Sequence, residues 1–338
     1  MTFQLSGSYD VVVVGGGAAG LNGALMLARS RRSVAVIDAG SPRNAPADGV
    51  HGLLARDGMP PAELLDLGRA EVRRYGGHVV DGEVTAVTRE DDRFMVALAD
   101  GRAVRARRLL VTTGLVDELP AVPGVRERWG RDVVHCPYCH GWEVRDQAIG
   151  VLATGPTAVH QALLFRQLSA DVTLFSHTQP PTAEQAEQLT ARGIDVVAGE
   201  VAAVEVAGDR IVGVRLADGR AVAREVVVVA SRMVARAGFL AALGLRAVPH
   251  PSGMGEHVPA DATGRTDVPG VWVAGNVTDL SAQVGTSAAA GATAGAHLNA
   301  DLIAEETRLA VEARRDPFGH DSEARVAELV AGDRRHGW

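Results

Sequence analysis

The chain has 338 residues, of which 46% are hydrophobic, and this length and composition favour two domains of ordinary size with substantial cores. The formal net charge is −7, from 34 basic and 41 acidic side chains, and no long basic run is present. This charge balance argues against nucleic acid or an anionic membrane surface as the main partner.

The N-terminal residues 1–10 lead into the first apolar run without a basic segment or a cleavage site. No apolar run reaches the length of a membrane span. We therefore expect a cytoplasmic protein, in which a catalytic disulfide is more reasonable than a structural one.

The first apolar run, Val11–Val14, predicts a buried parallel strand. A glycine-rich turn and a predicted helix at Leu21–Ala28 follow it, so the pattern G-x-G-x-x-G stands in the setting of a dinucleotide site. Gly15 permits the tight turn, Gly17 lets the backbone approach a pyrophosphate, and Gly20 lets the helix pack against the strand.

The phosphates of such a dinucleotide would lie at the N-terminus of this helix, beside Ala18 and Ala19, where free N–H groups favour anions. The next predicted strand, Val34–Ile37, ends in Asp38, whose carboxylate can bind the ribose hydroxyls of an adenosine. The alternative is a glycine-rich turn without a ligand, which the combination of strand, helix and acid disfavours.

The sequence also repeats itself. Residues Leu98–Val104 recur without change at Leu216–Val222, and both copies predict a hairpin around Asp-Gly. A strand rich in valine or leucine follows each hairpin, at Leu109–Thr112 and at Val226–Ala230. Two copies of one nucleotide-binding design are the simplest interpretation.

The only two cysteines, Cys136 and Cys139, stand in the stretch Cys-Pro-Tyr-Cys-His. The pattern C-x-x-C-H is compatible with attachment of a c-type haem, with half of a zinc site, and with a redox-active disulfide. Haem attachment normally follows export, and no export signal is visible. Zinc needs four ligands, and no second pair stands at a familiar spacing. We therefore favour a redox pair and expect no metal.

The second copy of the design begins at the predicted strand Ala148–Leu152. Its turn, Ala153–Ala158, has alanine where the first glycine of a nicotinamide site belongs, and a helix to about Leu168 follows. After the next strand, Asp171–Ser176, no arginine is present to bind a 2′-phosphate. This copy has the shape of a nucleotide site without its ligand chemistry, so NADPH binding is doubtful.

A last nucleotide signal is the predicted strand that closes on Ala274-Gly275-Asn276, before an alanine-rich helix at Thr286–Ala304. A cofactor as long as FAD needs a second backbone approach at its flavin end, and this turn can supply it. We expect an α/β protein with two Rossmann-like three-layer domains, the second inserted into the first. Their expected bounds are residues 1–117 and 247–310 for the FAD-binding domain, 118–246 for the inserted domain, and 311–338 for a charged tail, either a helix or a mobile end, without assigned chemistry.

These features resemble the low-molecular-weight thioredoxin reductase family over nearly the whole chain. The shared marks are the first glycine-rich turn, Thr112-Thr113-Gly114, the C-x-x-C pair and Val273–Asn276. More narrowly, the chain resembles FAD-dependent dithiol oxidases, which close intramolecular disulfides in natural products. That resemblance rests on His135–Glu143, on His51-Gly52 with Arg56-Asp57-Gly58, and on Gly275-Asn276 with Gln283.

The resemblance implies FAD as cofactor, a homodimer, a small-molecule dithiol as substrate and molecular oxygen as electron acceptor, with hydrogen peroxide as product. It implies that Cys136 is the outer, exchanging sulfur and that Cys139 lies beside the flavin. It also implies further cofactor-binding residues, namely Arg43, Asn44, His51, Thr113, Gly114, Gly275, Asn276, Gln283 and Val284.

Two departures from the reductase pattern concern the direction of electron flow. Reductases have an aspartate directly after the second cysteine, where this chain has His140, and they have a basic NADPH-binding run that is missing here. A histidine of ordinary pKa about 6.5 suits a base for a thiol, although His140 in a purely orienting role is an alternative. Both changes indicate oxidation of a dithiol; a thioredoxin-disulfide reductase using NADPH or another donor is the alternative, and a redox sensor without turnover a third.

Four other side chains, near the motif or near the flavin by resemblance, also carry expectations. His51 lies near the flavin by resemblance, and His135 is expected to pack beside the motif. Tyr138 and Trp142 are candidates for the wall of a substrate pocket, and packing explains them equally well.

Overall fold

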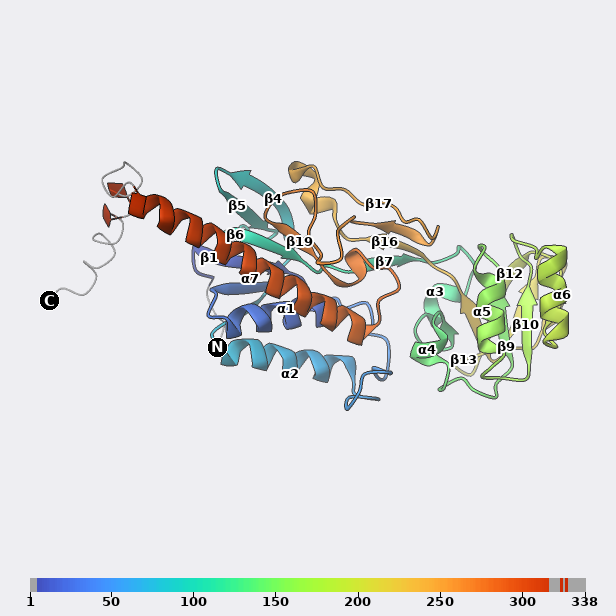
Figure 1. Cartoon of the computed structure of the whole chain (residues 1–338). Coiled ribbons are helices and arrows are strands. Elements are labelled where there is room, and N and C mark those ends of the chain that lie inside the picture. The colour runs from blue at the N-terminus through green and yellow to red at the C-terminus, as the bar shows by residue number, and fades with distance from the viewer. Residues whose placement is uncertain (1–4, 316–322, 325, 328–338) are drawn as a thin grey trace.

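The structure is a computed structural model that describes residues 5–315, 323–324 and 326–327. A mixed sheet and a parallel sheet lie in separate lobes, and a long C-terminal helix runs along the first lobe (Figure 1). In each lobe the parallel strands pack against helices on one face and against antiparallel strands on the other. The predicted α/β fold with two Rossmann-like, three-layer units is therefore confirmed.

The first lobe contains a seven-stranded sheet in the order β3-β2-β1-β6-β5-β4, with β19 paired to β6. Strand β6 is parallel to β1 and β19 and antiparallel to β5, so it joins the parallel part of the sheet to a meander. The strands are β1 (Ser8–Val14), β2 (Val34–Asp38), β3 (His78–Asp81), β4 (Val84–Glu90), β5 (Arg93–Leu98), β6 (Ala103–Val111) and β19 (Val271–Val273). The helices of this lobe are α1 (Ala18–Arg29), α2 (Pro61–Arg74) and α7 (Val284–Arg315).

The valines of β1 explain why this strand lies at the centre of the lobe. Val11 and Val13 pack into the cluster under the helices, whereas Val12 and Val14 pack into the cluster on the opposite face. Successive side chains of a strand point to opposite faces, so a continuous apolar run is what a strand buried on both faces requires. The sequence prediction for this strand is confirmed.

Small residues bring α1 and α7 into backbone contact. A Cβ atom on Gly291 would lie 1.9 Å from the carbonyl oxygen of Ala19, and one on Gly23 would lie 2.9 Å from that of Gly291. The N-terminal halves of the two helices therefore lie side by side, one after each of the two glycine-containing turns.

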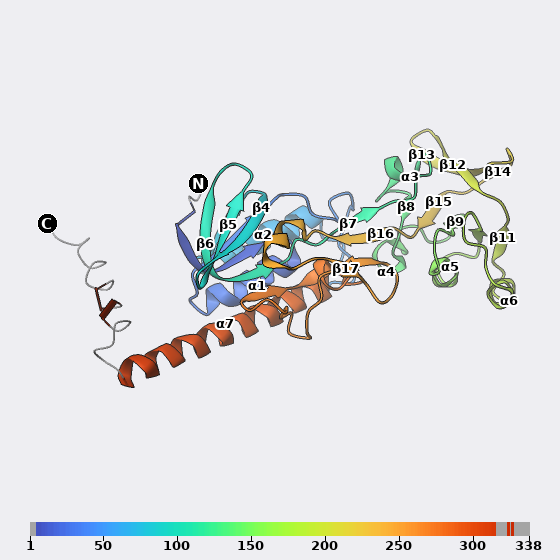
Figure 2. The ribbon, with the colours of Figure 1, turned by 90° about the horizontal axis from the view of Figure 1, so that it is seen from above.

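The expected bounds of the last helix are wrong at the C-terminal end. We expected Thr286–Ala304 and a tail from residue 311, but α7 extends to Arg315 and projects beyond the sheet (Figure 2). Charged residues after Ala304 remain in the helix because they pair with the sheet: Arg107 contacts Glu305 at 2.7 Å and Glu306 at 2.7 Å. Most of the expected tail, residues 316–322, 325 and 328–338, lies outside the described residues.

The second lobe contains a five-stranded parallel sheet in the order β11-β10-β9-β15-β8. Helices α5 (Ala158–Phe165) and α6 (Ala183–Ala191) cover one face, and the antiparallel strands β12 (Val201–Ala207), β13 (Arg210–Leu216) and β14 (Ala221–Val222) cover the other. The parallel strands are β8 (Val133–Val134), β9 (Ile149–Leu152), β10 (Val172–Phe175), β11 (Asp195–Val197) and β15 (Val226–Val229), and the short helices are α3 (Val125–Arg128) and α4 (Pro137–His140).

Two antiparallel strands connect the lobes, β7 (Leu115–Glu118) on the way out and β16 (Arg232–Ala235) on the way back. They form a small sheet with β17 (Val248–Pro249) and β18 (Gly255–His257). The 3-10 helix η1 (Gly238–Leu243) follows, and its Leu240 packs in the core of the first lobe. This packing indicates that the chain re-enters the first lobe near residue 231, before the expected bound at residue 246. The other domain bounds stay a prediction.

The internal repeat is visible as two hairpins with the same hydrogen bonds. The amide of Leu98 donates to the carbonyl of Arg102, and the amide of Leu216 donates to that of Arg220, at 2.9 and 2.8 Å. Both turns have a glycine with positive φ, at positions 101 and 219. The first copy differs in one respect, because its second hairpin strand continues without a break as the core strand β6.

Among the described residues, no helix is long and apolar enough to cross a membrane.

The close approach of α1 and α7 gives a first testable prediction. Gly291→Ala should lower the free energy of unfolding by about 1–3 kcal/mol, because its methyl group meets the backbone of Ala19. Urea unfolding of the FAD-saturated protein measures this. The matched control is Gly285→Ala in the same helix, whose methyl would meet nothing closer than 3.6 Å and should be neutral or slightly stabilising. Equal effects of the two variants would contradict the packing described.

Candidate active site

The two cysteines lie together because a tight helical turn carries them. Cys136 caps α4 in extended conformation, Pro137 occupies the first helical position, and the carbonyl of Cys136 accepts from the amides of Cys139 and His140 at 3.2 and 3.1 Å. Residues three apart share a helix face. The two Sγ atoms are accordingly 2.6 Å apart, and both thiols are free and partly buried.

The two thiols differ in acidity. The hydrogen bond that Cys139 donates lowers the pKa of Cys136 to about 7, with help from the amides of Tyr138 and Cys139 and from the positive charge of Arg43. The same contact, together with burial, raises the pKa of Cys139. Cys136 is therefore the more acidic of the two thiols and is about half thiolate at pH 7, which suits the exchanging role that the resemblance implies for it.

His140 follows the second thiol at the end of α4. Burial lowers the pKa of His140, the negative charges of Glu143 and Asp48 oppose this effect, and the charge of His51 adds to it. Its Nε2 atom is buried without a hydrogen-bond partner. At neutral pH the imidazole is therefore uncharged and able to accept a proton.

A large cavity of about 1490 Å³ joins this pair to the glycine-rich turn of the first lobe. Both lobes line it, the first through the ends of β1, β2 and β19 and the second through α4 and the start of α5. The volume exceeds that of a pocket for an ordinary small ligand and is large enough for a dinucleotide with a substrate. All predicted catalytic and cofactor-binding residues line the cavity except Gly20.

The turn between β1 and α1 has the geometry expected of a phosphate cradle. Gly15 has φ +105°, and a Cβ there would lie 2.5 Å from the carbonyl oxygen of Thr112. Gly17 meets nothing within 4 Å and caps α1 without a side-chain hydrogen bond, so the backbone is open to the cavity beside Ala18 and Ala19. Gly20 lies behind the turn, where a Cβ would meet the carbonyl of Gly15 at 1.9 Å. These residues fit the pyrophosphate of FAD.

Asp38 lies at the end of β2, as predicted, and lines the cavity. One carboxylate oxygen contacts the guanidinium of Arg69 at 3.0 Å, and the other accepts from the amide of Gly40 at 3.2 Å. Arg69 holds the carboxylate at the edge of the cavity, where it suits the ribose of the adenosine half. The sequence analysis did not identify Arg69, because nothing in the pattern links it to the turn.

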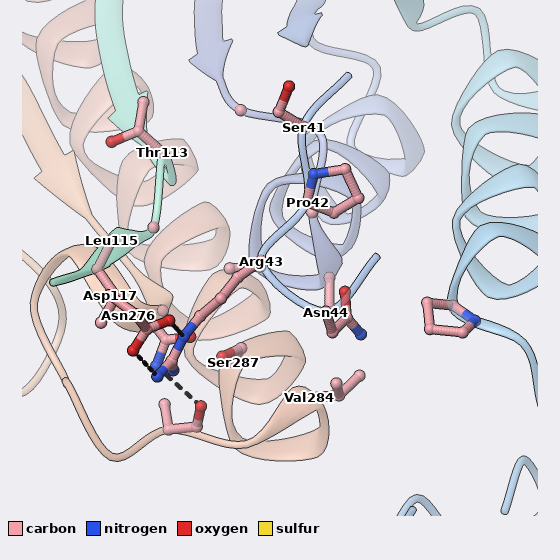
Figure 3. A pocket seen from close by; sticks show the side chains of 18 of the residues that line it. Ser41, Pro42, Arg43, Asn44, Thr113, Leu115, Asp117, Asn276, Val284 and Ser287 are labelled. Carbon is pink, nitrogen blue, oxygen red and sulfur yellow. Dashed lines mark hydrogen bonds and ion pairs between the residues drawn. The ribbon is translucent and has the colours of Figure 1, made fainter. Parts of the chain in front are cut away.

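Arg43 lines the cavity but directs its guanidinium at protein groups (Figure 3). Two of its nitrogens contact the carboxylate of Asp117 at 2.7 Å each, and the hydroxyl of Ser231 donates to the same carboxylate at 2.6 Å. Burial works to raise the pKa of Asp117, but these hydrogen bonds hold it below its ordinary value. Asn44, the next residue, also lines the cavity. This network ties the loop after β2 to both connecting strands, and the sequence analysis missed Asp117 and Ser231.

The second glycine turn also meets the cavity (Figure 3). Gly275 has φ +75° and lies against Ala19, where a Cβ would be 3.0 Å from that of Ala19. The side-chain amide of Asn276 donates to backbone carbonyls of the following loop, including that of Ala282 at 2.9 Å. Asn276 thereby shapes the loop that presents Gln283 and Val284 to the cavity.

The structure also places the remaining candidates. The hydroxyl of Thr113 donates to the carbonyl of Arg236 at 2.6 Å, and Gly114 follows it in the cavity wall. Tyr138 lines the cavity and is 68% exposed, whereas Trp142 is 66% exposed and packs its ring under Arg145 outside the cavity. Tyr138 therefore remains a candidate wall residue.

His135 lies beside the pair, and its Nδ1 atom is buried without a partner. Burial and the charge of Arg43 lower the pKa of His135. The amide nitrogen of Gln161 in α5 donates to the carbonyl of His135 at 3.2 Å and fixes the start of the motif.

Comparisons with known proteins show the family of the chain. Residues 9–296 match the pyridine nucleotide-disulphide oxidoreductase family, and the chain belongs to it. The thioredoxin reductase tcpT of Claviceps purpurea is 32% identical over 315 residues, which are 88% of this chain and 95% of that protein. The thioredoxin reductase sirT of Leptosphaeria maculans is 29% identical over 309 residues, 86% and 93% of the two chains.

Two solved structures are similar over most of their length. The crystal structure of HlmI has a TM-score of 0.87 and 48% identity, and covers 94% of this chain and 100% of that chain. An oxidoreductase from Agrobacterium tumefaciens has a TM-score of 0.81 and 35% identity, and covers 88% and 99%. The protein is thus a thioredoxin reductase-like, flavin-dependent disulfide oxidoreductase, as the sequence predicted.

The hydrogen bond between the thiols gives a second prediction. In the reduced holoenzyme, Cys139→Ala removes the donor that lowers the pKa of Cys136, so alkylation of Cys136 by iodoacetamide should slow at pH 7. A rise of about one pKa unit reduces the thiolate fraction about fivefold. The rate of alkylation against pH measures the effect, and Tyr138→Phe, which leaves the backbone amides in place, is the control. An unchanged profile in Cys139→Ala would show that another group stabilises the thiolate.

Proposed function

We propose that the protein is an FAD-dependent dithiol oxidase that closes an intramolecular disulfide in a small-molecule dithiol. The observation that carries this proposal is the redox pair followed by an uncharged, half-buried histidine, His140, where a reductase has an aspartate. A neutral imidazole accepts the proton of an incoming thiol at neutral pH, which is the task of an oxidase whose substrate arrives as a dithiol. A cytoplasmic homodimer is part of the same proposal.

The second lobe supports this direction of electron flow. In the turn after β9, the hydroxyl of Thr154 donates to the carbonyl of Ala230 at 3.3 Å, and that of Thr178 donates to the carbonyl of Ala153 at 3.5 Å. The ring of His177 accepts from the amide of Val201 at 3.0 Å. The chain's own groups thus occupy the polar positions of this turn, and residues 176–180 contain no guanidinium for a 2′-phosphate. Dithiol, rather than NADPH, is the proposed source of electrons.

The proposed cycle begins with the Cys136–Cys139 disulfide. A substrate thiol gives its proton to His140, and the resulting thiolate attacks the Cys136 sulfur, which forms a mixed disulfide and releases Cys139 as a thiolate. The second substrate thiolate then attacks the substrate sulfur of the mixed disulfide, closes the ring and releases Cys136. The low pKa of Cys136 makes it a good leaving group in this step. The substrate has lost two protons and two electrons, and the pair has gained the electrons.

The residues of the two glycine turns fit FAD, with Gly15, Gly17 and Asp38 at its adenosine and pyrophosphate half and Gly275 at its flavin half. The chemistry that FAD supplies when bound is acceptance of the electron pair from the Cys139 side and its delivery to an external acceptor. Molecular oxygen, which becomes hydrogen peroxide, is the acceptor in this proposal.

The second candidate function is a thioredoxin-disulfide reductase. The names of the curated relatives favour it, because tcpT and sirT are both called thioredoxin reductases. It requires electrons from NADPH or another donor to reach the flavin, so the two candidates predict opposite responses to dithiol and to NADPH.

A peroxide assay tests the oxidase. In air, the holoenzyme mixed with dithiothreitol should form about one hydrogen peroxide per dithiol oxidised, because each disulfide releases one electron pair. Cys136→Ser and Cys139→Ser should each abolish peroxide while FAD stays bound, and Glu312→Gln on α7, outside the cavity, serves as the control with both thiols intact. Full peroxide formation in either cysteine variant would contradict the role of the pair.

His140 gives a separate prediction. His140→Gln should slow dithiol oxidation at neutral pH about 100-fold, a usual loss for a general base. The acid side of the pH–rate profile, where protonated His140 cannot accept a proton, should disappear in the variant. Steady-state rates across the pH range measure both effects. A variant with full activity and the same acid limb would assign the base to another group.

A further inference from the structure

His51 and Glu143 make a direct contact between the two lobes at the mouth of the site. The His51 ring lies between two carboxylates, with Nε2 at 3.4 Å from Glu143 and Nδ1 at 3.6 Å from Asp57. His51 belongs to the loop between β2 and α2 of the first lobe, and Glu143 lies just after α4 of the second lobe. The side chains are 23% and 42% exposed, so the pair is only partly open to solvent.

The loop that carries His51 is held firmly. Val50 and Met59 form an antiparallel bridge across its base, and the amide of Val50 donates to the carbonyl of Met59 at 2.8 Å. The amide of Gly52, which has φ +70°, donates to Asp57 at 2.9 Å and orients that carboxylate toward the His51 ring. A preorganised loop of this kind presents the imidazole in one place.

His140 lies within the field of both partners. Besides Glu143 on its own segment, the charged groups that act on it are His51 and Asp48 from the loop. His135, which precedes the pair of cysteines in the sequence, also interacts with His140. Because Nε2 of His140 is buried without a partner, the ring depends on these neighbouring charges and not on a direct hydrogen bond at that atom. Glu143 favours the protonated ring and His51 disfavours it.

We propose that His51 and Glu143 are positioning residues for the proposed oxidase reaction: their contact holds α4 against the cavity, and the carboxylate of Glu143 and the ring of His51, when it is protonated, act on His140 in opposite directions. This inference rests on the proposed function, because His51 and Glu143 affect the reaction through His140, the proposed base. If the contact only held the lobes together, removal of either side chain would have the same effect on the rate. If the two charges act on His140, removal of Glu143 and removal of His51 shift the acid limb of the pH profile in opposite directions.

In the test, the FAD-loaded enzyme is mixed rapidly with dithiothreitol in the absence of oxygen. The rate of flavin bleaching is measured across neutral pH. Glu143→Gln should move the acid limb of the profile about half a pH unit lower, and His51→Gln should move it a similar amount higher. The double variant should return the limb near its wild-type position while bleaching more slowly, because the tie between the lobes is lost. Glu312→Gln, which removes an exposed carboxylate paired with Arg308 on α7, is the matched control.

A shift of both single variants in one direction, or no shift in either, would overturn the proposal. Titration of the His140 ring by NMR in the reduced holoenzyme, assigned with His140→Gln, gives the same opposite shifts without any turnover. If dithiothreitol does not bleach the wild-type flavin, the proposed function fails, and the NMR titration still decides on the pair.

Discussion

The site depends on the single turn of helix that holds two sulfur atoms against each other. Proline at the first position of α4 and the extended cap at Cys136 fix this turn, and the spacing of three residues then brings the thiols to one face. The contact makes the thiols unequal, because the donor Cys139 stabilises the thiolate of Cys136. One local geometry thus brings together two sulfurs of unequal acidity, on which the proposed order of their reactions is based.

The remainder of the fold places this turn at the cavity that the glycine turns of the first lobe also line. Glycine turns on β1 and β19 converge through the packing of α1 on α7, and the loop after β2 bridges to the second lobe. Arg43 with Asp117 and His51 with Glu143 anchor that loop at two points. The positive charge of Arg43, a residue of the first lobe, therefore acts on the two thiols of the second lobe. Residues of both lobes line the cavity.

Much of the fold could be predicted because it follows local rules. The valine run of β1, the glycine turn and the repeated Asp-Gly hairpins each specify their own geometry. The predicted C-terminal end of α7 was wrong. Ion pairs with Arg107 stabilise a helical segment whose charged composition alone does not separate it from a tail. Asp117, Ser231 and Glu143 could not be assigned roles from the sequence, because their partners lie far away in the chain and depend on tertiary packing.

The central claim is that electrons enter the flavin from a dithiol and not from NADPH. Anaerobic rapid mixing of the oxidised holoenzyme with each donor in turn, followed at the flavin absorbance, tests this most directly. The account predicts prompt bleaching by dithiothreitol, loss of that bleaching in Cys139→Ser, and no comparable bleaching by NADPH. Prompt bleaching by NADPH together with an inert response to dithiothreitol would contradict it.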